Sequence, residues 1–247
     1  MTDSIRDALA AGKPSLGSWL NLASPLAAEV MAAAGYSWLV VDAEHTAFDL
    51  GLITHTFRAI EARGAVALAR VWDHDPVTIG RVLDAGACGL VLPHVSTPEE
   101  AQEIVSAMRY PPSGTRSSGT GRCVTLADDY RQRANDQLLC IPQIEDIEGI
   151  NNAEAIAMVD GVDIGFLGPS DLALSMGVAI GSPDHEQELQ RFREACARAG
   201  VPSGLPVPNP SDVPRRLEEG FQFIDIASDL RFMDNGAREA LALARLG

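Results

Sequence analysis

Short apolar runs recur along the whole chain, and polar segments with helical character separate them. Most of the runs are continuously apolar, which is typical of parallel strands that are covered on both faces. The alternation of strands and helices implies parallel pairing through right-handed crossovers. The predicted strands span residues 16–22, 36–42, 65–71, 89–95, 138–145, 163–168, 202–207 and 221–228.

Helix-start and helix-stop signals fill the intervals between these runs. Ser24 and Pro25 open one segment and Gly35 follows its end, while residues 96–108 repeat the Ser/Thr, Pro, acidic opening. Eight such units in 247 residues predict a single-domain α/β protein, a (β/α)₈ TIM barrel over residues 1–247. A helix at residues 2–11 is expected under its N-terminal face. The alternative is a doubly wound open sheet, but no G-x-G-x-x-G motif follows the first strand.

The segment 109–136 interrupts this rhythm, because it is far longer than an ordinary connection from a helix to a strand. We interpret it as an excursion at the surface or at a subunit interface, since it lies at the barrel end away from catalytic sites. Phosphate binding is the weaker interpretation, because no strand precedes the segment and no GK[ST] closes it. If Arg116 or Arg122 touches a substrate, we expect that substrate to belong to a neighbouring subunit.

Charge and composition narrow the classes of function. The 34 acidic against 19 basic residues give a net charge of −15, which argues against nucleic-acid or anionic-membrane partners. Lys13 is the only lysine and precedes the first strand, so a Schiff-base mechanism lacks a nucleophile at the catalytic end. Cys88, Cys123, Cys140 and Cys196 show no CxxC motif and predict buried free thiols. Without a signal-like or membrane-spanning stretch, we expect a cytoplasmic protein.

Polar and charged side chains gather where the predicted strands end. Barrel enzymes build their active sites at the C-terminal ends of the strands, so we expect the chemistry there. The run at 36–42, for example, stops being apolar because the chain leaves the core and enters the site. The residues at these strand ends are Asn21, Asp42, Glu44, His45, Arg70, Pro93, His94, Gln143, Glu145, Gly168, Pro169, Ser170, Asp171, Pro208, Asn209, Ser228 and Asp229.

Two of these acids are placed to share a divalent cation. Gln143 and Glu145 lie two positions apart on one strand and therefore project to the same face. Asp171 follows the end of the adjacent strand, and two carboxylates plus water suit Mg²⁺ or Mn²⁺. The simpler alternatives are that Asp171 or Ser170 caps the following helix and that Glu145 is an exposed acid.

Arg70 and His45 complete the expected chemistry. A guanidinium beside a divalent cation stabilises developing negative charge, as on an enolate oxygen. His45 can take and return a proton near neutral pH when a carboxylate orients it, and its spacing from Asp42 favours that acid. Taken singly, Arg70 could be half of a structural ion pair and His45 an ordinary loop histidine.

The strings "LVVDAEHTAFD", "ANDQLLCIPQIED" and "VDGVDIGFLGPSDLALSMG" resemble the pyruvate-dependent class II aldolases of the HpcH/HpaI type, and similarity extends from about residue 14 to the C-terminus. The resemblance implies a barrel of the phosphoenolpyruvate/pyruvate type. It also implies a divalent metal, Mg²⁺, Mn²⁺ or Co²⁺, held by Glu145 and Asp171.

The resemblance assigns further roles. Gln143 and the Ser170 backbone would hold the 2-oxo acid, Arg70 would stabilise the enolate, and His45 would be the base. The carboxylate that raises the basicity of His45 corresponds to Asp84, whereas the spacing favours Asp42, and both stay open. The remaining residues expected to bind substrate are Trp19, Gly168 and Pro169.

The expected reaction is the reversible cleavage of a 4-hydroxy-2-oxo acid into pyruvate and an aldehyde. Ala43, Asn21 and residues 205–210 depart from the family pattern, so the aldehyde is not defined. One rival is a metal-dependent decarboxylase of oxaloacetate that uses the same enolate, and another is a non-catalytic binding module. The resemblance also implies a homo-oligomer, a hexamer built as a trimer of dimers, with a swapped C-terminal helix at residues 231–246.

Overall fold

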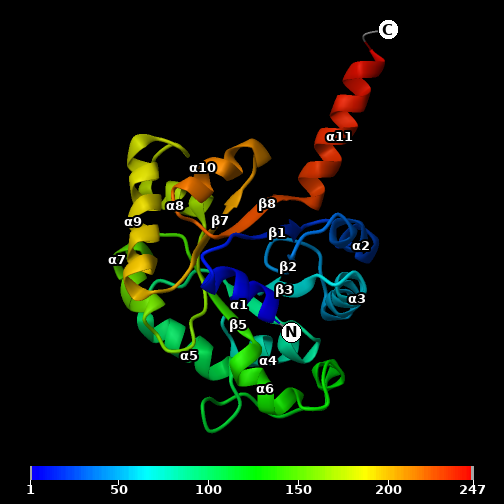
Figure 1. The fold of residues 1–247 in the computed structure, drawn as a ribbon, viewed down its shortest axis with the longest axis vertical. Coiled ribbons are helices and arrows are strands. Elements are labelled where there is room, and N and C mark those ends of the chain that lie inside the picture. Colours follow the sequence, from blue (N-terminus) through cyan, green and yellow to red (C-terminus); the bar gives the residue numbers. More distant parts are fainter. Residues whose placement is uncertain (1, 246–247) are drawn as a thin grey trace.

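Eight parallel strands pair in sequence order and close into a barrel between β8 and β1 in the computed structural model (Figure 1). The structure describes residues 2–245. Each strand overlaps one predicted apolar run, so the predicted (β/α)₈ barrel is confirmed. The strands are β1 Ser15–Leu20, β2 Trp38–Asp42, β3 Val66–Arg70, β4 Gly89–Leu92, β5 Leu139–Ile144, β6 Gly165–Leu167, β7 Ser203–Val207 and β8 Phe223–Ser228.

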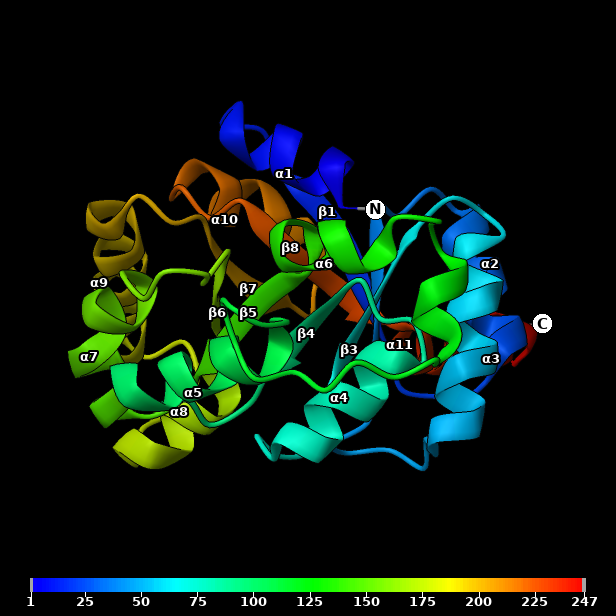
Figure 2. The same ribbon diagram turned by 90° about the horizontal axis from the view of Figure 1, so that it is seen from below.

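Helices follow the strands and form an outer layer around the barrel (Figures 1 and 2). Ser24 caps α2 by accepting the N–H of Ala27, as its sequence signal predicted. Thr97 and Glu100 form a capping box at the start of α5. The helices are α1 Asp3–Ala10, α2 Pro25–Ala33, α3 Leu50–Glu61, α4 Pro76–Asp84, α5 Pro98–Met108, α6 Tyr130–Gln137, α7 Ile147–Ala157, α8 Pro169–Met176, α9 Pro183–Ala199, α10 Val213–Glu218 and α11 Asp229–Ala244, with short 3₁₀ turns at Arg122–Thr125 and Pro210–Asp212.

Two hydrophobic layers follow from the alternation of side chains along each strand. One layer packs the strands against the surrounding helices. The other fills the barrel interior and is closed from below by Ile5 and Leu9 of α1. The Arg6 guanidinium donates to the carbonyl oxygen of Leu138 at 3.0 Å, just before β5 begins. The predicted helix under the N-terminal face of the barrel is therefore present.

The segment 109–136, interpreted from the sequence as an excursion at the surface or at a subunit interface, contains a 3₁₀ turn and most of α6. Arg116 is buried, lies over the ring of Tyr110 and donates to Asp84 at 2.9 Å. Arg122 forms an ion pair with Glu61. Both arginines are thus engaged within their own chain, where they fasten the segment to the barrel.

The four cysteines are buried and free, as predicted. Within residues 2–245, no helix combines the length and the apolar character that crossing a bilayer requires. Helix α11 starts two residues before the predicted range 231–246, whose last residue lies outside the described part of the chain. It projects away from the barrel (Figure 1), and Asp229 is its only buried residue.

Gly17 allows the largest interior side chain to fit. A Cβ atom at this position would lie 2.0 Å from the Trp38 ring, which is fully buried and stacks on Phe223 at 4.0 Å. We expect Gly17→Ala to lower the free energy of unfolding by about 1–3 kcal/mol through overpacking. The measurement is the midpoint of urea denaturation.

Gly80→Ala is the matched control, because an added Cβ inside α4 meets no atom within 4 Å. It should be neutral or stabilise by up to about 1 kcal/mol, since alanine favours a helix more than glycine does. Equal effects of the two substitutions would contradict this account of the barrel interior.

Candidate active site

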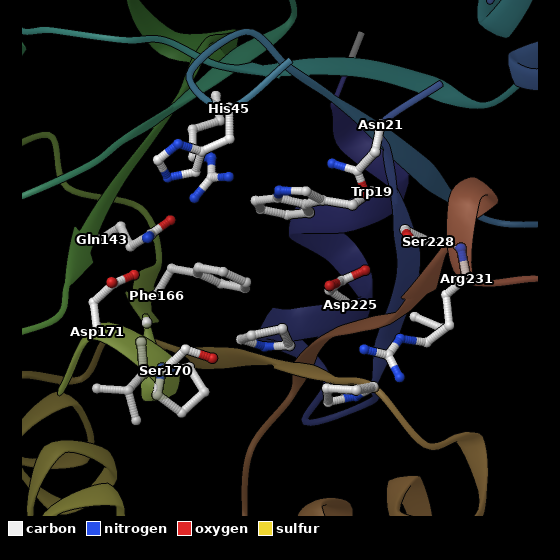
Figure 3. Close-up of a pocket in the computed structure, with 17 residues that line it drawn as sticks. Trp19, Asn21, His45, Gln143, Phe166, Ser170, Asp171, Asp225, Ser228 and Arg231 are labelled. Atoms are coloured by element: carbon white, nitrogen blue, oxygen red, sulfur yellow. Dashed lines mark hydrogen bonds between the residues drawn. The ribbon is translucent and has the colours of Figure 1, made fainter. Parts of the chain in front are cut away.

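A cavity of about 280 Å³ opens at the C-terminal ends of the strands, where the sequence placed the chemistry (Figure 3). Its floor is aromatic, because Trp19 of β1 stacks on Phe166 of β6 with ring centroids 5.4 Å apart. Asp42 and Glu145 lie behind the lining residues. Asp42 accepts a hydrogen bond from Arg70, and Glu145 accepts one from Gln143. The predicted site residues that line the cavity are Trp19, His45, Arg70, Gln143, Gly168, Pro169, Ser170 and Asp171.

The Arg70 guanidinium is held in a fixed position at this rim. Its Nε and Nη2 donate to the two oxygens of Asp42 at 2.9 and 2.8 Å, which makes a bidentate pair. Its Nη1 lies 3.1 Å from Oε2 of Glu44. The pair follows from the strand register, since Asp42 and Arg70 are direct neighbours across β2 and β3. Asn21 donates a further hydrogen bond to Asp42 at 3.0 Å.

Burial disfavours the charged form of Arg70, but the acids around it favour that form more strongly. Desolvation alone would lower the pKa of this guanidinium. The hydrogen bonds and charge of Asp42, with the charges of Glu44 and Glu145, outweigh burial and raise the pKa above its ordinary value. Arg70 therefore presents a permanent, oriented positive charge beside the cavity.

His45 lies in the loop after β2 and lines the cavity with an exposed ring. Its Nε2 is 3.6 Å from Oε2 of Glu44, so the acid closest to the imidazole in these contacts is Glu44. Asp42 instead accepts the backbone N–H groups of Glu44 and His45 at 3.2 and 3.4 Å. Asp42 thus fixes the main chain that carries His45, and its carboxylate is occupied by Arg70.

Asp84 lies elsewhere in the chain, at the last residue of α4. Within residues 2–245 its carboxylate contacts Arg116 and Cys123 and does not line the cavity. Its pairing with His45 stays a prediction, and it requires a second copy of the chain.

Glu145 occupies a desolvated position under the lining. One of its oxygens accepts the backbone N–H of His94 at 2.7 Å, and the other accepts from the Gln143 side chain at 2.5 Å. Burial, followed by the charge of Asp171, raises the pKa of Glu145 against the lowering effect of these hydrogen bonds. Gly168 packs directly on it, because a Cβ there would lie 2.5 Å from Oε2 of Glu145.

Asp171 and Ser170 lie in the first turn of α8, which begins immediately after β6. The N-cap is Gly168, and no side chain caps this helix end. The capping alternative for Asp171 and Ser170 is therefore wrong, and both residues line the cavity instead. An uncapped helix start presents free N–H groups and a partial positive charge to an anionic ligand.

Sequence reasoning missed several residues that the fold brings to this cavity. Asp225 and Arg231 line it, and the first had a readable signal, because it lies two positions after Phe223 and so shares the inward face. Glu44 and His94 were noted at strand ends without a role. The ring of His94 bridges Oε1 of Glu44 and Oε1 of Glu145, with both contacts at 3.0 Å.

Comparison with known proteins defines the family. The family model for HpcH/HpaI aldolase/citrate lyase matches residues 15–235, and the chain belongs to this family. It is 38% identical to a hydroxypyruvate/pyruvate aldolase of Roseovarius nubinhibens over 98% of this chain and 96% of that protein. It is 37% identical to a 4-hydroxy-2-oxo-heptane-1,7-dioate aldolase of Salmonella dublin over 100% and 95%.

The fold also matches that of a solved structure. The crystal structure of an HpcH/HpaI aldolase/citrate lyase family protein from Burkholderia cenocepacia J2315 superposes with a TM-score of 0.94 at 35% identity. The match covers 99% of this chain and 100% of that one.

We expect strong coupling between Asp42 and Arg70, because both partners are buried and bidentate. A double-mutant cycle with Asp42→Ala and Arg70→Ala should give a coupling free energy of about 2 kcal/mol in urea denaturation. The exposed pair Glu29 and Arg63, at 2.6 Å, is the control and should couple by less than about 1 kcal/mol. Similar coupling in the two cycles would show that burial adds nothing to the pair.

Proposed function

We propose that this protein is a divalent-metal-dependent aldolase with a barrel of the phosphoenolpyruvate/pyruvate type. In this proposal it reversibly cleaves a 4-hydroxy-2-oxo acid into pyruvate and an aldehyde. The observation that carries the proposal is the oriented Arg70 guanidinium facing a cavity that His45 and Asp171 also line. The aldolase names of the two relatives support the reaction class.

The donor set fits a divalent cation held by Glu145 and Asp171. The raised pKa of Glu145 is caused first by burial and also by the charge of Asp171, and a divalent cation between the two carboxylates would relieve this repulsion. Within residues 2–245 there is no cluster of three or more His, Cys, Asp or Glu side chains arranged for a metal. Two carboxylates would leave the other coordination positions to water and substrate oxygens. When bound, the cation would supply electrostatic stabilisation of negative charge at the 2-oxo group.

The 2-oxo acid has suitable partners on the same side of the cavity. Its carboxylate would accept hydrogen bonds from the N–H groups at the start of α8, including that of Ser170. The Gln143 amide is held by its bond to Glu145, so its orientation is set before a ligand arrives. The Arg70 guanidinium would lie against the oxygen on C2.

His45 and Arg70 have separate roles in the proposed cleavage. His45 takes the proton of the C4 hydroxyl, the C3–C4 bond breaks, and the carbonyl of the aldehyde forms. The electron pair of that bond moves into an enolate whose oxygen Arg70 stabilises, because the guanidinium is already oriented and needs no reorganisation. Return of the proton that His45 took to C3 of the enolate gives pyruvate. Glu44, beside the imidazole, would orient the ring for this transfer.

We also propose that the chain assembles with copies of itself through α11. This helix exposes large apolar side chains, among them Met233, Leu241 and Leu243. Burying them on a second copy would account for exposed apolar side chains on a helix that projects from the barrel. The hexamer and the exchange of α11 between subunits are part of this proposal.

Arg70→Ala should reduce turnover of a 4-hydroxy-2-oxo acid by at least about 100-fold, since it removes the group placed to stabilise the enolate. Arg70→Lys keeps the charge but cannot form the bidentate pair, and we expect it to recover only part of the rate. Pyruvate release gives the rate, and circular dichroism verifies the fold. Unchanged turnover in a folded Arg70→Ala protein would refute the role.

His45→Ala distinguishes the aldolase from an oxaloacetate decarboxylase, because decarboxylation forms the same enolate without deprotonating a hydroxyl group. We expect this variant to lose cleavage of the hydroxy-oxo acid far more than any decarboxylation of oxaloacetate. Equal losses on the two substrates, measured as pyruvate formation, would remove His45 as the base.

Chelation with EDTA should abolish cleavage, and Mg²⁺, Mn²⁺ or Co²⁺ should restore it. Glu145→Gln should weaken Mn²⁺ binding by at least about tenfold, measured by electron paramagnetic resonance without substrate. The control is Asp160→Asn, because the side chain of Asp160 is fully exposed and does not line the cavity. Equal Mn²⁺ affinity in the Glu145→Gln and unaltered proteins would exclude Glu145 as a ligand.

A further inference from the structure

His94 contacts two acids of the site, and the proposed cleavage gives it no role. It lies two residues after the end of β4. Its ring Nε2 is 3.0 Å from Oε1 of Glu44, and its ring Nδ1 is 3.0 Å from Oε1 of Glu145. Its backbone N–H donates to the same oxygen of Glu145 at 2.7 Å. One residue therefore contacts Glu145 with both its main chain and its side chain.

The backbone of His94 adopts a conformation that few residues other than glycine adopt. Its φ angle is +56°, in the left-handed region. Such a conformation persists only where the surrounding structure enforces it, and it is concentrated at functional sites. At this position the left-handed turn brings the N–H and the ring nitrogen of one residue to a single carboxylate oxygen.

Stability does not account for the ring of His94. Its side chain is 64% exposed, whereas those of Glu44 and Glu145 are 9% and 3% exposed. An ion pair with a largely exposed partner adds little to the stability of a protein. The contacts of the ring instead restrict the orientation of two buried carboxylates.

These contacts connect the proposed metal site to the Arg70 guanidinium. Oε2 of Glu44 lies 3.1 Å from Nη1 of Arg70, and Oε1 of the same carboxylate faces His94. The ring of His94 continues the connection to Glu145, whose other oxygen accepts from the Gln143 side chain at 2.5 Å. Glu145 is thus held at both oxygens, and one of its two anchors leads to Arg70.

We propose that His94 is a positioning residue that orients Glu145 for the divalent cation and ties this carboxylate to Arg70 through Glu44. The bonds to Oε1 set the orientation of Glu145 before the cation arrives, as outer hydrogen-bonding partners of metal ligands do. The link through Glu44 holds the carboxylate in place relative to the guanidinium. This inference rests on the proposed function, in which Glu145 and Asp171 hold the cation.

The test compares variants of His94 by their affinity for Mn²⁺, measured by electron paramagnetic resonance without substrate. His94→Gly removes the ring but keeps the backbone N–H, and glycine adopts the left-handed conformation without strain, so this variant should fold. His94→Asn also tolerates that conformation, and its amide nitrogen replaces Nδ1 but is too short to reach Glu44. The control is His55→Ala, because His55 is an exposed residue of α3 outside the cavity lining.

His94→Gly should weaken Mn²⁺ binding about tenfold, the effect of losing an outer partner of a metal ligand. His94→Asn should bind Mn²⁺ more tightly than His94→Gly, and His55→Ala should bind it as the unaltered protein does. Unchanged affinity in folded His94→Gly would overturn the proposal. Tighter binding would also overturn it, because the ring would then compete with the cation for Glu145.

Turnover at saturating Mn²⁺ tests the connection to Arg70. His94→Asn should cleave the hydroxy-oxo acid more slowly than the unaltered protein even when the metal site is full, because its side chain does not tie Glu145 to Glu44. Unaltered kcat in this variant under these conditions would remove the link through Glu44 from the proposal.

Electron spin-echo modulation of bound Mn²⁺ distinguishes a positioning residue from a metal ligand. An imidazole bound directly to the ion adds a strong nitrogen coupling. We expect the nitrogen couplings of the unaltered protein and of His94→Gly to be the same. A coupling that disappears in His94→Gly would make His94 a ligand and refute its positioning role.

Two outcomes separate this inference from the proposed function. If Glu145→Gln weakens Mn²⁺ binding and the unaltered protein cleaves the hydroxy-oxo acid, but His94→Gly binds Mn²⁺ normally, the positioning role fails and the aldolase stands. If the unaltered protein has no Mn²⁺ site that depends on Glu145, the proposed metal site fails and the role of His94 fails with it.

Discussion

The site depends on a guanidinium buried at the mouth of the barrel. The Arg70 side chain is only 11% exposed, and a charge in that position is stable only when it is paired and hydrogen-bonded. The pairing is a consequence of the fold, because the parallel register of β2 and β3 sets Asp42 beside Arg70. A shift of one residue would turn one partner to the outer layer and leave the other charge unpaired. The strand register that closes the barrel therefore also fixes the position of the Arg70 charge.

The same alternation of side chains supplies the floor beneath that charge. Trp19 lies under the guanidinium, 5.5 Å from ring centroid to Cζ, and stacks in turn on Phe166. This aromatic floor excludes water from one side of the cavity, and a charge in such surroundings acts more strongly on a ligand than it would in bulk water. Gly17 makes room for Trp38 deeper in the interior, so the packing below the site needs a residue without a side chain.

The periodicity of the sequence was sufficient to predict the barrel fold, because continuous apolar runs indicate parallel strands. It also predicted a site at the C-terminal ends of these strands. It placed Arg70, Asp171 and Gln143 at one cavity because strand ends converge there. It could not choose among neighbouring acids, and the acid beside the His45 ring in this chain is Glu44, because the register of β2 and β3 sets Asp42 against Arg70 instead. The sequence did not predict that Arg231 lines the cavity, because the position of this residue depends on the direction in which α11 leaves β8.

The distribution of charge around the cavity gives the proposed metal and substrate sites a physical basis. Asp42 and Glu44 contact the Arg70 guanidinium directly, whereas Glu145 contacts the His94 imidazole and interacts with Arg70 only through its charge. The uncompensated negative charge therefore lies at the β5–β6 edge, which is where a cation is favourable. The uncompensated positive charge lies at the start of α11. An anionic substrate approaching a protein of net charge −15 gains only from local positive charge, which the Arg70 guanidinium and the start of α11 supply.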